Sequence, residues 1–497
     1  MEDTEAALLT ERMIPPPREI RFADGPEYLL ADGCRITLRA AEPDGVGTLA
    51  ETLCRRFWGI VPALVVETDP AAAALGPEEY KIRVDAAALT ITTRGVPGVR
   101  HAFGTLRQLA EVRRGTERST GSFLVPCEIR DAPAMPFRGL HLCIFPETPL
   151  WDIEKRLRLA AYHKFNYAVI ECWGVFPFES HPEFCWRDRR INRGEFKRII
   201  RLARELGITP IPQFNILGHA TCSRVATGKH FVLDFAPEFQ PLFEPAGWSW
   251  CLSNPETRRI LADLTGELHD FFERPPFFHI GCDEAYDLGS CHTCRHRVLK
   301  DLVRDHILWF RQRFAERGAR VIMWHDMLLA KGDERWKGYI VGARSGSGLE
   351  ELYRELPRDI VIADWQYGCP VTPEHPEPEW PTVHFFADEK FDVLVSPWLN
   401  NNGTASLGRL AASNHLAGML ETSWHIAHGN KFNDILGVAA SAAWNPEATQ
   451  PAAAQGRRLT MAHHTRQIGW DMGSSEYERT GFCQQQVDPG THPHEVK

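Results

Sequence analysis

The sequence lacks the features that define several large classes of protein. It has no stretch of about 18 uncharged apolar residues, which excludes an ordinary membrane span. Its net charge is −9 and no block of Lys or Arg interrupts that balance, so nothing favours nucleic acid or another polyanion as a partner. The N-terminus has no basic segment followed by an apolar one, so no secretory signal is visible and we expect a cytoplasmic protein.

Several motifs of catalysis and metal binding are also missing. The chain has no Gly-rich phosphate loop, no nucleophile elbow and no zincin motif. Its 13 cysteines are an odd number scattered among apolar stretches, which is typical of reduced, buried thiols in a cytoplasmic protein. Cys291, His292 and Cys294 together with Cys282 suggest zinc, but a structural site needs four ligands and no second Cys-x-x-Cys exists. We therefore expect a surface turn there, and no metal or cofactor.

What is present is an ordinary globular composition over 497 residues, 43% hydrophobic and 24% charged. Tyr80–Val84 and Leu89–Thr93 alternate apolar with polar residues and predict two half-buried strands. Residues 96–114 follow, with apolar side chains at helical spacing. Strands beside an amphipathic helix predict a small α+β domain over residues 1–132.

After Pro133 and Pro136 the pattern changes to strands that alternate with helices. The predicted strands are Phe137–Ile144, Tyr167–Trp173, Ile208–Asn215, Phe277–Glu284, Arg320–Asp326, Ile360–Tyr367, Val393–Asn400 and Gly418–Trp424. Eight strands alternating with helices predict an α/β fold, a (β/α)8 TIM barrel over residues 137–445. A C-terminal helix and polar tail are expected over 446–497, and the insert Leu217–Asn254 is expected to form a loop over the barrel mouth.

The predicted strand Phe277–Glu284 ends in two adjacent carboxylates, Asp283 and Glu284. Chemistry in barrels gathers at the carboxyl ends of the strands, although an Asp-Glu pair is also common at a solvated helix N-terminus. Neighbouring side chains on a strand point to opposite faces, so the two acids can meet one ligand only if the strand ends there and the chain twists. Their roles should then differ: one acid protonates a leaving group while its neighbour orients a nucleophile carried by the substrate.

Two stretches resemble one known family. His279-Ile280-Gly281-Cys282-Asp283-Glu284 resembles the His-x-Gly-Gly-Asp-Glu motif of family 20 glycoside hydrolases, the β-N-acetylhexosaminidases, with Cys282 in place of the second Gly. The Tyr and Asp-Leu-Gly that follow look closest to the hexosaminidase D-like branch. The run Gly98–Leu109, which ends in Gly-Thr-Leu-Arg-Gln-Leu, resembles the helix of the non-catalytic domain that precedes the barrel in this family.

The resemblance implies roles for the acids and for a nearby histidine. Glu284 would be the general acid, and we expect burial and the neighbouring anion to raise its pKa. Asp283 would accept the N–H of a 2-acetamido group and direct its oxygen to the anomeric carbon, giving an oxazolinium intermediate. His219 follows Gly218 as in the Pro-Gly-His element of the family, so it is expected to support the acid, with Asn215 where the family commonly has Asp.

Aromatic residues end four consecutive predicted strands: Trp324, Trp365, Trp398 and Trp424. They could enclose the methyl of an acetamido group and stack on a sugar, or they could simply cap the core. Tyr367 could donate its hydroxyl to the acetamide oxygen, a role that a Tyr plays in the family.

The first predicted strand departs from the family. Members often show Arg-Gly-x-x-x-Asp-x-x-Arg, whereas this chain has Arg138-Gly139 and lacks both the Asp and the second Arg. Recognition of the sugar hydroxyls must then come from other groups. The candidates, with Arg138 itself, are His141, Glu147, Glu171, Asp326 and Glu421. Neither N-acetylgalactosamine nor N-acetylglucosamine is favoured by the sequence.

The function that these features predict is an exo-acting, retaining β-N-acetylhexosaminidase acting on a carbohydrate with a terminal 2-acetamido sugar. One alternative is a two-carboxylate β-glycosidase, such as a β-galactosidase that pairs Glu284 with Glu421 or Glu171. Another is a non-catalytic amino-sugar-binding protein on a decayed barrel. We expect no nucleic-acid or membrane partner, and leave open whether the chain forms a homodimer.

Overall fold

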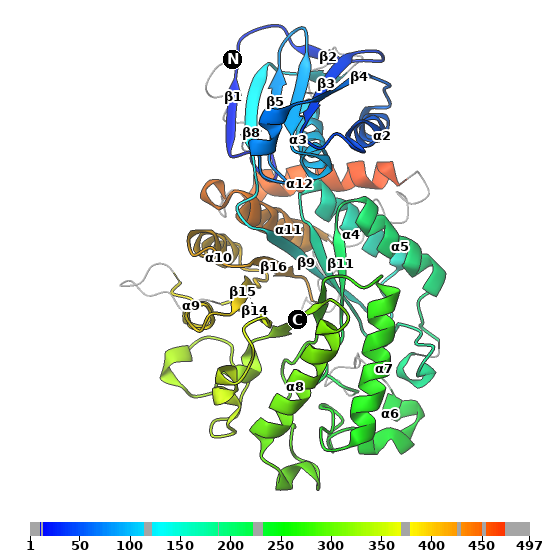
Figure 1. Ribbon diagram of the computed structural model, residues 1–497, viewed down its shortest axis with the longest axis vertical. Helices are drawn as coiled ribbons and strands as arrows, with labels where there is room; N and C mark the ends of the chain where they lie inside the picture. Colours follow the sequence, from blue (N-terminus) through cyan, green and yellow to red (C-terminus); the bar gives the residue numbers. More distant parts are fainter. Residues whose placement is uncertain are drawn as a thin grey trace. The chain divides into compact units, whose positions relative to one another are not determined.

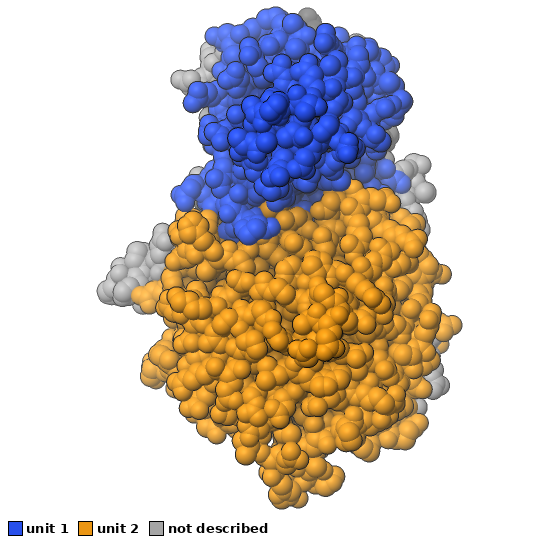
Figure 2. Space-filling view, viewed as in Figure 1, with its two compact units in different colours: residues 1–136, 158–165, 429–497 blue, residues 137–157, 166–428 orange. Residues whose placement is uncertain are grey.

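The computed structural model describes residues 10, 13–113, 122–186, 188–221, 232–368, 378–424, 429–449 and 454–472. The chain divides into two compact units, which Figure 2 shows in different colours. The first contains Met1–Pro136, Arg158–Phe165 and Gly429–Lys497, and the second contains Phe137–Leu157 and Asn166–His428. The domain limits expected from the sequence, at 132 and 445, stay predictions. Most of the polar tail, from residue 473, lies outside the described residues.

The first unit contains the predicted α+β region. Its six-stranded sheet has the order β1 (Glu19–Phe22), β8 (Cys127–Asp131), β5 (Tyr80–Val84), β6 (Leu89–Thr93), β3 (Arg35–Ala40) and β4 (Ala63–Thr68). The helices are α2 (Val46–Trp58), α3 (Val96–Arg113), α11 (Gly429–Trp444) and α12 (Ala454–Asp471), and β2 (Tyr28–Leu30) pairs with β7 (Ser122–Leu124). The two predicted strands are confirmed as β5 and β6, which pair antiparallel with Ile82 opposite Ile91. Helix α3 buries the apolar stripe that predicted it, including Val99, Phe103 and Leu106.

The second unit is built on a closed barrel of eight parallel strands, as predicted. They are β9 (Phe137–Ile144), β10 (Tyr167–Cys172), β11 (Thr209–Gln213), β12 (Phe277–His279), β13 (Arg320–Trp324), β14 (Val361–Asp364), β15 (Asp392–Val395) and β16 (Gly418–Thr422), and β16 pairs with β9 to close the barrel. Most strands end earlier than the sequence suggested. Several of the residues expected at the strand ends, including Asp283, Glu284 and Asp326, therefore lie in the loops that follow the strands.

Alternating side chains of these strands fill the barrel. Phe137, Val169, Ile211, Ile322 and Leu420 belong to one buried apolar cluster inside it. Burial of each such side chain contributes about 1.5–3 kcal/mol. Because the side-chain period of a strand is two residues, this cluster also decides which of the predicted site residues point into the barrel and which point outward.

Helices follow most of the strands and cover them. They are α4 (Leu150–Tyr162), α5 (Arg193–Glu205), α7 (Pro255–Phe271), α8 (Leu299–Ala315), α9 (Pro381–Asp388) and α10 (Asn401–Ser413). In Figure 1, α5, α7, α8 and α10 lie around the barrel strands. Helix α7 begins where the sequence favours it, since Asn254 caps the amide of Glu256 and Pro255 occupies the first turn. None of the described helices is long and apolar enough to cross a membrane.

Candidate active site

The loop after β12 holds the two adjacent carboxylates in an unusual backbone conformation. Gly281, Cys282 and Glu284 all have positive φ, at 67°, 76° and 48°. Non-glycine residues rarely adopt this conformation, and such strain gathers at functional sites. The strand therefore ends before the acids, and the twist that the sequence required is present. Cys282 lies in the left-handed region at the position where the family motif has its second Gly.

Both carboxylates meet at one histidine. His219 Nε2 lies 3.3 Å from Asp283 Oδ2 and 3.3 Å from Glu284 Oε2. His219 itself has φ 53°, which lies in the left-handed region. Asp283 is 3% exposed, whereas the Glu284 side chain is 32% exposed. The site thus has one buried carboxylate and one that faces the opening, which suits two different roles.

Asn215 holds this arrangement together. Its Nδ2 donates a hydrogen bond to Asp283 Oδ1, and its Oδ1 accepts from the amides of Leu217 and Cys282, each at 3.1 Å. An ionised Asp could accept from the same two amides but could not donate to Asp283, and it would repel that carboxylate. The substitution of Asn for the common Asp therefore changes the contact made to Asp283. The sequence flagged this departure without revealing its role.

The pKa expected for Glu284 is wrong in direction. Burial raises the pKa of this carboxyl, but hydrogen bonds from His219 and Tyr286 outweigh burial and lower it below the ordinary value. Tyr286 Oη donates to Glu284 Oε1 at 2.7 Å. Hydrogen bonds of this kind favour the ionised form of the carboxyl. The sequence could not predict them, because they depend on the folded positions of His219 and Tyr286.

Replacing Tyr286 with Phe is expected to raise the pKa of Glu284, because the variant loses a donor to the ionised carboxylate. If Glu284 must carry a proton to act as a general acid, the alkaline limb of the kcat/KM profile should move to higher pH. The measurement is a pH–rate profile of both proteins with a p-nitrophenyl β-N-acetylhexosaminide. An alkaline limb that stays in place would show that Glu284 does not control it.

Asp326 is the acid whose pKa is raised. Burial and then the negative charge of Asp283 raise the pKa of Asp326 to about 8. Its carboxyl accepts hydrogen bonds from the Glu284 amide at 3.0 Å and from Trp365 Nε1 at 3.3 Å. At neutral pH Asp326 therefore stays largely protonated, which spares the site a further negative charge beside Asp283.

Aromatic side chains form a connected wall across four strand ends. The ring centroids of Trp324 and Trp424 are 5.4 Å apart, those of Trp365 and Trp424 are 6.3 Å apart, and Tyr367 lies 5.2 Å from Trp398. Trp424 Nε1 donates to the hydroxyl of Tyr367 at 2.5 Å. The structure thus brings the five predicted aromatic residues together in one connected cluster.

Two predicted site residues point away from the barrel interior. Arg138 and Glu421 alternate with Phe137 and Leu420, which belong to the interior cluster, so they occupy the outer face of β9 and β16. Glu421 is fully buried, and burial holds its pKa well above the ordinary value. This outward orientation argues against Glu421 as the partner of Glu284 in a two-carboxylate mechanism.

Glu171 has the same inward orientation as Val169 and is 2% exposed. Its Oε2 accepts a hydrogen bond from Trp173 Nε1 at 3.0 Å and lies 4.0 Å from His141 Nε2. The His141 ring lies 4.7 Å from that of Trp424, at the base of the aromatic wall. These two residues remain candidates for sugar recognition, whereas Glu147 is exposed.

Sequence reasoning assigned no role to Trp248. Its Nε1 donates to the backbone oxygen of Glu284 at 2.5 Å, and its ring lies 4.5 Å from that of His219. Trp248 belongs to the insert Leu217–Asn254, part of which, residues 222–231, lies outside the described residues. The one available signal was a pair of tryptophans, at 248 and 250, within an otherwise unassigned insert.

A pocket of about 570 Å³ lies beside the acids. Tyr286 and Met327 contribute to its wall, and Lys331 and Arg344 supply positive charge. Since Tyr286 contacts Glu284, this pocket adjoins the side of the site from which the general acid would act.

A barrel of eight parallel strands with paired carboxylates and aromatic residues at the strand ends is an arrangement that glycoside hydrolases use. Residues 189–367 match the family model described as Glycosyl hydrolase family 20, catalytic domain. This segment is therefore similar to the catalytic domain of glycosyl hydrolase family 20, the family that the motifs indicated. The matched segment includes Asp283, Glu284 and Asp326 but ends before Trp398 and Trp424.

Named relatives agree with this family. The chain is 26% identical over 430 residues to a beta-hexosaminidase of Vibrio furnissii, covering 76% of this chain and 68% of that protein. It is 24% identical over 342 residues to a beta-hexosaminidase of Emericella nidulans, covering 62% of this chain and 50% of that protein. It is 25% identical over 215 residues to Hexosaminidase D of Bos taurus, covering 41% of this chain and 55% of that protein. The chain thus spans only about half the length of the last two relatives.

Solved structures share the fold. The Flavobacterium johnsoniae chitobiase has a TM-score of 0.67 at 17% identity, over 92% of this chain and 73% of that chain. The Streptomyces plicatus N-acetyl-beta-hexosaminidase has a TM-score of 0.63 at 18% identity, over 91% of this chain and 96% of that chain. At these identities the likeness shows the architecture alone.

Proposed function

We propose that the protein is an exo-acting, retaining β-N-acetylhexosaminidase that uses the acetamido group of its substrate as the nucleophile. The observation that carries the proposal is the convergence of two adjacent carboxylates on His219, each at 3.3 Å, with different exposure. A conventional retaining enzyme places its two acids about 5 Å apart on either side of the scissile bond, whereas these two acids are consecutive residues that contact one histidine. The pair can serve one acid and one orienting anion.

In the proposed reaction Asp283 accepts the acetamide N–H, which turns the carbonyl oxygen toward the anomeric carbon. That oxygen forms a bond to the carbon while the glycosidic bond breaks, and Glu284 gives its proton to the departing oxygen. Water then attacks the oxazolinium ion, Glu284 takes a proton from the water, and the acetamido group is restored. Two displacements at the same carbon retain its configuration.

Glu284 must hold a proton to begin this cycle, although its pKa is lowered in the free protein. A bound sugar would exclude water from the exposed side of Glu284, and desolvation favours the neutral acid. The lowered pKa supports an acidic optimum for kcat/KM, since the protonated fraction of the free enzyme falls as pH rises through that pKa.

We propose that the aromatic wall encloses the acetamido methyl, and that Tyr367 contacts the acetamide oxygen. Trp424 donates to the Tyr367 hydroxyl, which still has a proton of its own to donate. His141 lies beside Trp424, and Glu171 lies beside His141, so both could hold the sugar hydroxyls. The leaving group would occupy the pocket beside Tyr286. A cytoplasmic location stays a prediction.

The test compares hydrolysis of p-nitrophenyl β-glycosides of GlcNAc, GalNAc, Glc and Gal by the full chain. We expect turnover of the acetamido sugars to exceed that of Glc and Gal by at least about a hundredfold, since the last two lack the nucleophile. Equal turnover of the Gal or Glc substrate would contradict substrate assistance. It would favour a mechanism with a second catalytic carboxylate, for which Glu171 is the first candidate. Binding of acetamido sugars without turnover of any substrate would favour the carbohydrate-binding alternative.

A further inference from the structure

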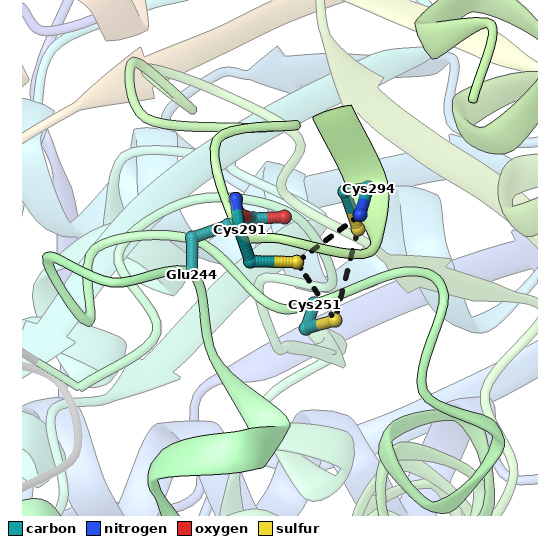
Figure 3. Close-up of side chains that lie close together, drawn as sticks. All are labelled: Glu244, Cys251, Cys291 and Cys294. Carbon is teal, nitrogen blue, oxygen red and sulfur yellow. Dashed lines mark hydrogen bonds between the residues drawn. The ribbon is translucent and has the colours of Figure 1, made fainter. Parts of the chain in front are cut away.

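Four buried side chains with metal-binding atoms meet outside the active site. Glu244, Cys251, Cys291 and Cys294 are 0%, 5%, 8% and 2% exposed. One ligand atom from each lies within 4.8 Å of the others, and Figure 3 shows the three sulfur atoms turned toward one another. Cys251 Sγ is 3.6 Å from Cys291 Sγ and 3.7 Å from Cys294 Sγ, and all three cysteines are free thiols.

Two separate segments supply these residues. Glu244 and Cys251 lie on a short hairpin in which Phe243 and Trp250 form an antiparallel bridge. Cys291 and Cys294 belong to the loop that follows the two active-site acids and leads into η4 (Cys294–His296). The backbone amide of Cys294 donates to Cys291 Sγ at 3.2 Å, a hydrogen bond that stabilises a thiolate. The cluster therefore joins the insert to the catalytic loop.

Glu244 distinguishes this cluster from a simple packing of thiols. Its Oε2 accepts hydrogen bonds from the amide of Cys291 at 2.5 Å and from Ser290 Oγ at 3.3 Å. Its Oε1 is buried and accepts no hydrogen bond from the described residues. A buried carboxylate oxygen without a partner is costly, and a cation beside it removes that cost.

Three protonated thiols packed together could also show these sulfur–sulfur distances. Leu302 packs against the three cysteines, as it would in an apolar cluster. The distances equally suit zinc: bonds of about 2.3 Å to sulfur in tetrahedral geometry place the sulfur atoms about 3.8 Å apart. A buried carboxylate with one oxygen that accepts no hydrogen bond from the described residues does not suit an apolar cluster. Three thiolates and one carboxylate, by contrast, complete a closed set of four ligands. The carboxylate therefore decides between the two.

We propose that Glu244, Cys251, Cys291 and Cys294 bind a structural zinc ion. Binding would release the three thiol protons to solvent, and Glu244 would join as a carboxylate, leaving two formal negative charges on the complex. The backbone amides of Cys291 and Cys294 and the hydroxyl of Ser253, 3.1 Å from Cys294 Sγ, face those charges. These ligands differ from those that the sequence suggested. Cys291 and Cys294 are common to both sets, whereas Cys282 and His292 are not in the cluster.

The zinc ion would hold the hairpin that carries Trp248 against the loop that carries Glu284. Between the two ligands of the hairpin, the Glu244 amide donates to the Ser249 oxygen at 2.8 Å, so Trp248 sits in a closed turn. Trp248 reaches the backbone of Glu284 and the ring of His219 from this turn. The proposed ion is therefore a positioning element for the acid, and it takes no part in bond making.

The test is the metal content of the full chain, purified without chelator and dialysed against dilute zinc sulfate. We expect about one zinc ion per chain, and less than about a tenth of that in Cys291→Ser and Cys251→Ser. Cys185→Ser is the matched control, because Cys185 is a buried free thiol in the same unit outside the cluster. A wild-type protein without zinc, or cysteine variants that retain it, would overturn the proposal. The readout is independent of hydrolytic activity, so failure of the proposed function leaves it unchanged.

A second measurement covers variants that do not fold. The wild-type protein is alkylated with iodoacetamide before and after removal of metal by a chelator, and labelled cysteines are located by mass spectrometry. Cys251, Cys291 and Cys294 should be protected with zinc and labelled without it, while labelling of Cys185 stays unchanged. Glu244→Gln should weaken zinc binding by at least about tenfold while leaving the thiols in place. Equal labelling in both states would count against the site.

Discussion

Replacing Asp283 with Asn or Glu284 with Gln should each lower kcat/KM on a p-nitrophenyl β-N-acetylhexosaminide by at least about a hundredfold. Asn at 283 removes the charge that stabilises the developing positive charge on the acetamido group. Gln at 284 removes the proton donor. Both substitutions nearly preserve volume, so the fold should persist and the loss should fall in kcat. Steady-state kinetics, with circular dichroism to confirm folding, measures this.

The two losses should differ when the leaving group changes. A dinitrophenyl leaving group departs without protonation, so Glu284→Gln should recover much of the lost rate on a dinitrophenyl substrate. Asp283→Asn should not recover, because Asp283 acts on the nucleophile and not on the leaving group. Glu421→Gln is the matched control. Glu421 is a buried carboxyl on the outer face of β16, and burial holds its pKa well above the ordinary value, so the activity of this variant should stay close to that of the wild type. Recovery of Asp283→Asn on the activated substrate would contradict the assigned roles.

Gly281→Ala should abolish most activity and destabilise the protein. A Cβ at this position would lie 2.5 Å from Asn215 Cγ and 2.8 Å from its Cα, at a φ of 67° that favours glycine. Overpacking of this kind costs about 1–3 kcal/mol, and the left-handed backbone adds about 1 kcal/mol. Because Asn215 donates to Asp283, any shift that relieves the clash also moves the catalytic carboxylate. Unfolding in urea and kcat/KM measure the two effects.

Gly318→Ala separates these causes. Gly318 has φ 77°, and a Cβ there would meet nothing within 4 Å. This control should therefore show only the backbone cost, about 1 kcal/mol, and keep wild-type activity. If the two variants have equal free energies of unfolding and equal activities, the close approach of Gly281 to Asn215 contributes neither to stability nor to activity.

Much of the fold was predictable because its signals are local. Alternating apolar runs and helical stripes predicted the eight strands, and the Asp283–Glu284 motif predicted the acids. The pKa of Glu284 was not predictable, since it depends on donors from His219 and Tyr286 that only folding brings within reach. The outward orientation of Glu421 follows from its alternation with Leu420, a signal present in the sequence but usable only once the interior face was known.

The proposed zinc ligands illustrate a different limit. The Cys291-x-x-Cys294 spacing is a local signal, but the other two ligands lie about 40 residues away in an insert without periodicity. No pattern along the chain relates Glu244 to Cys291. Only the hairpin that returns Cys251 to the same point shows that the four side chains meet.

The sequence by itself determined the parallel barrel, the α+β region and the identity of the paired carboxylates, because each depends on spacing along a single segment. The tertiary structure alone decided which side chains share the site, which carboxyl keeps its proton and which cysteines meet. Those properties depend on burial and on hydrogen bonds between segments distant in the chain, and both arise only when the strands close into a barrel.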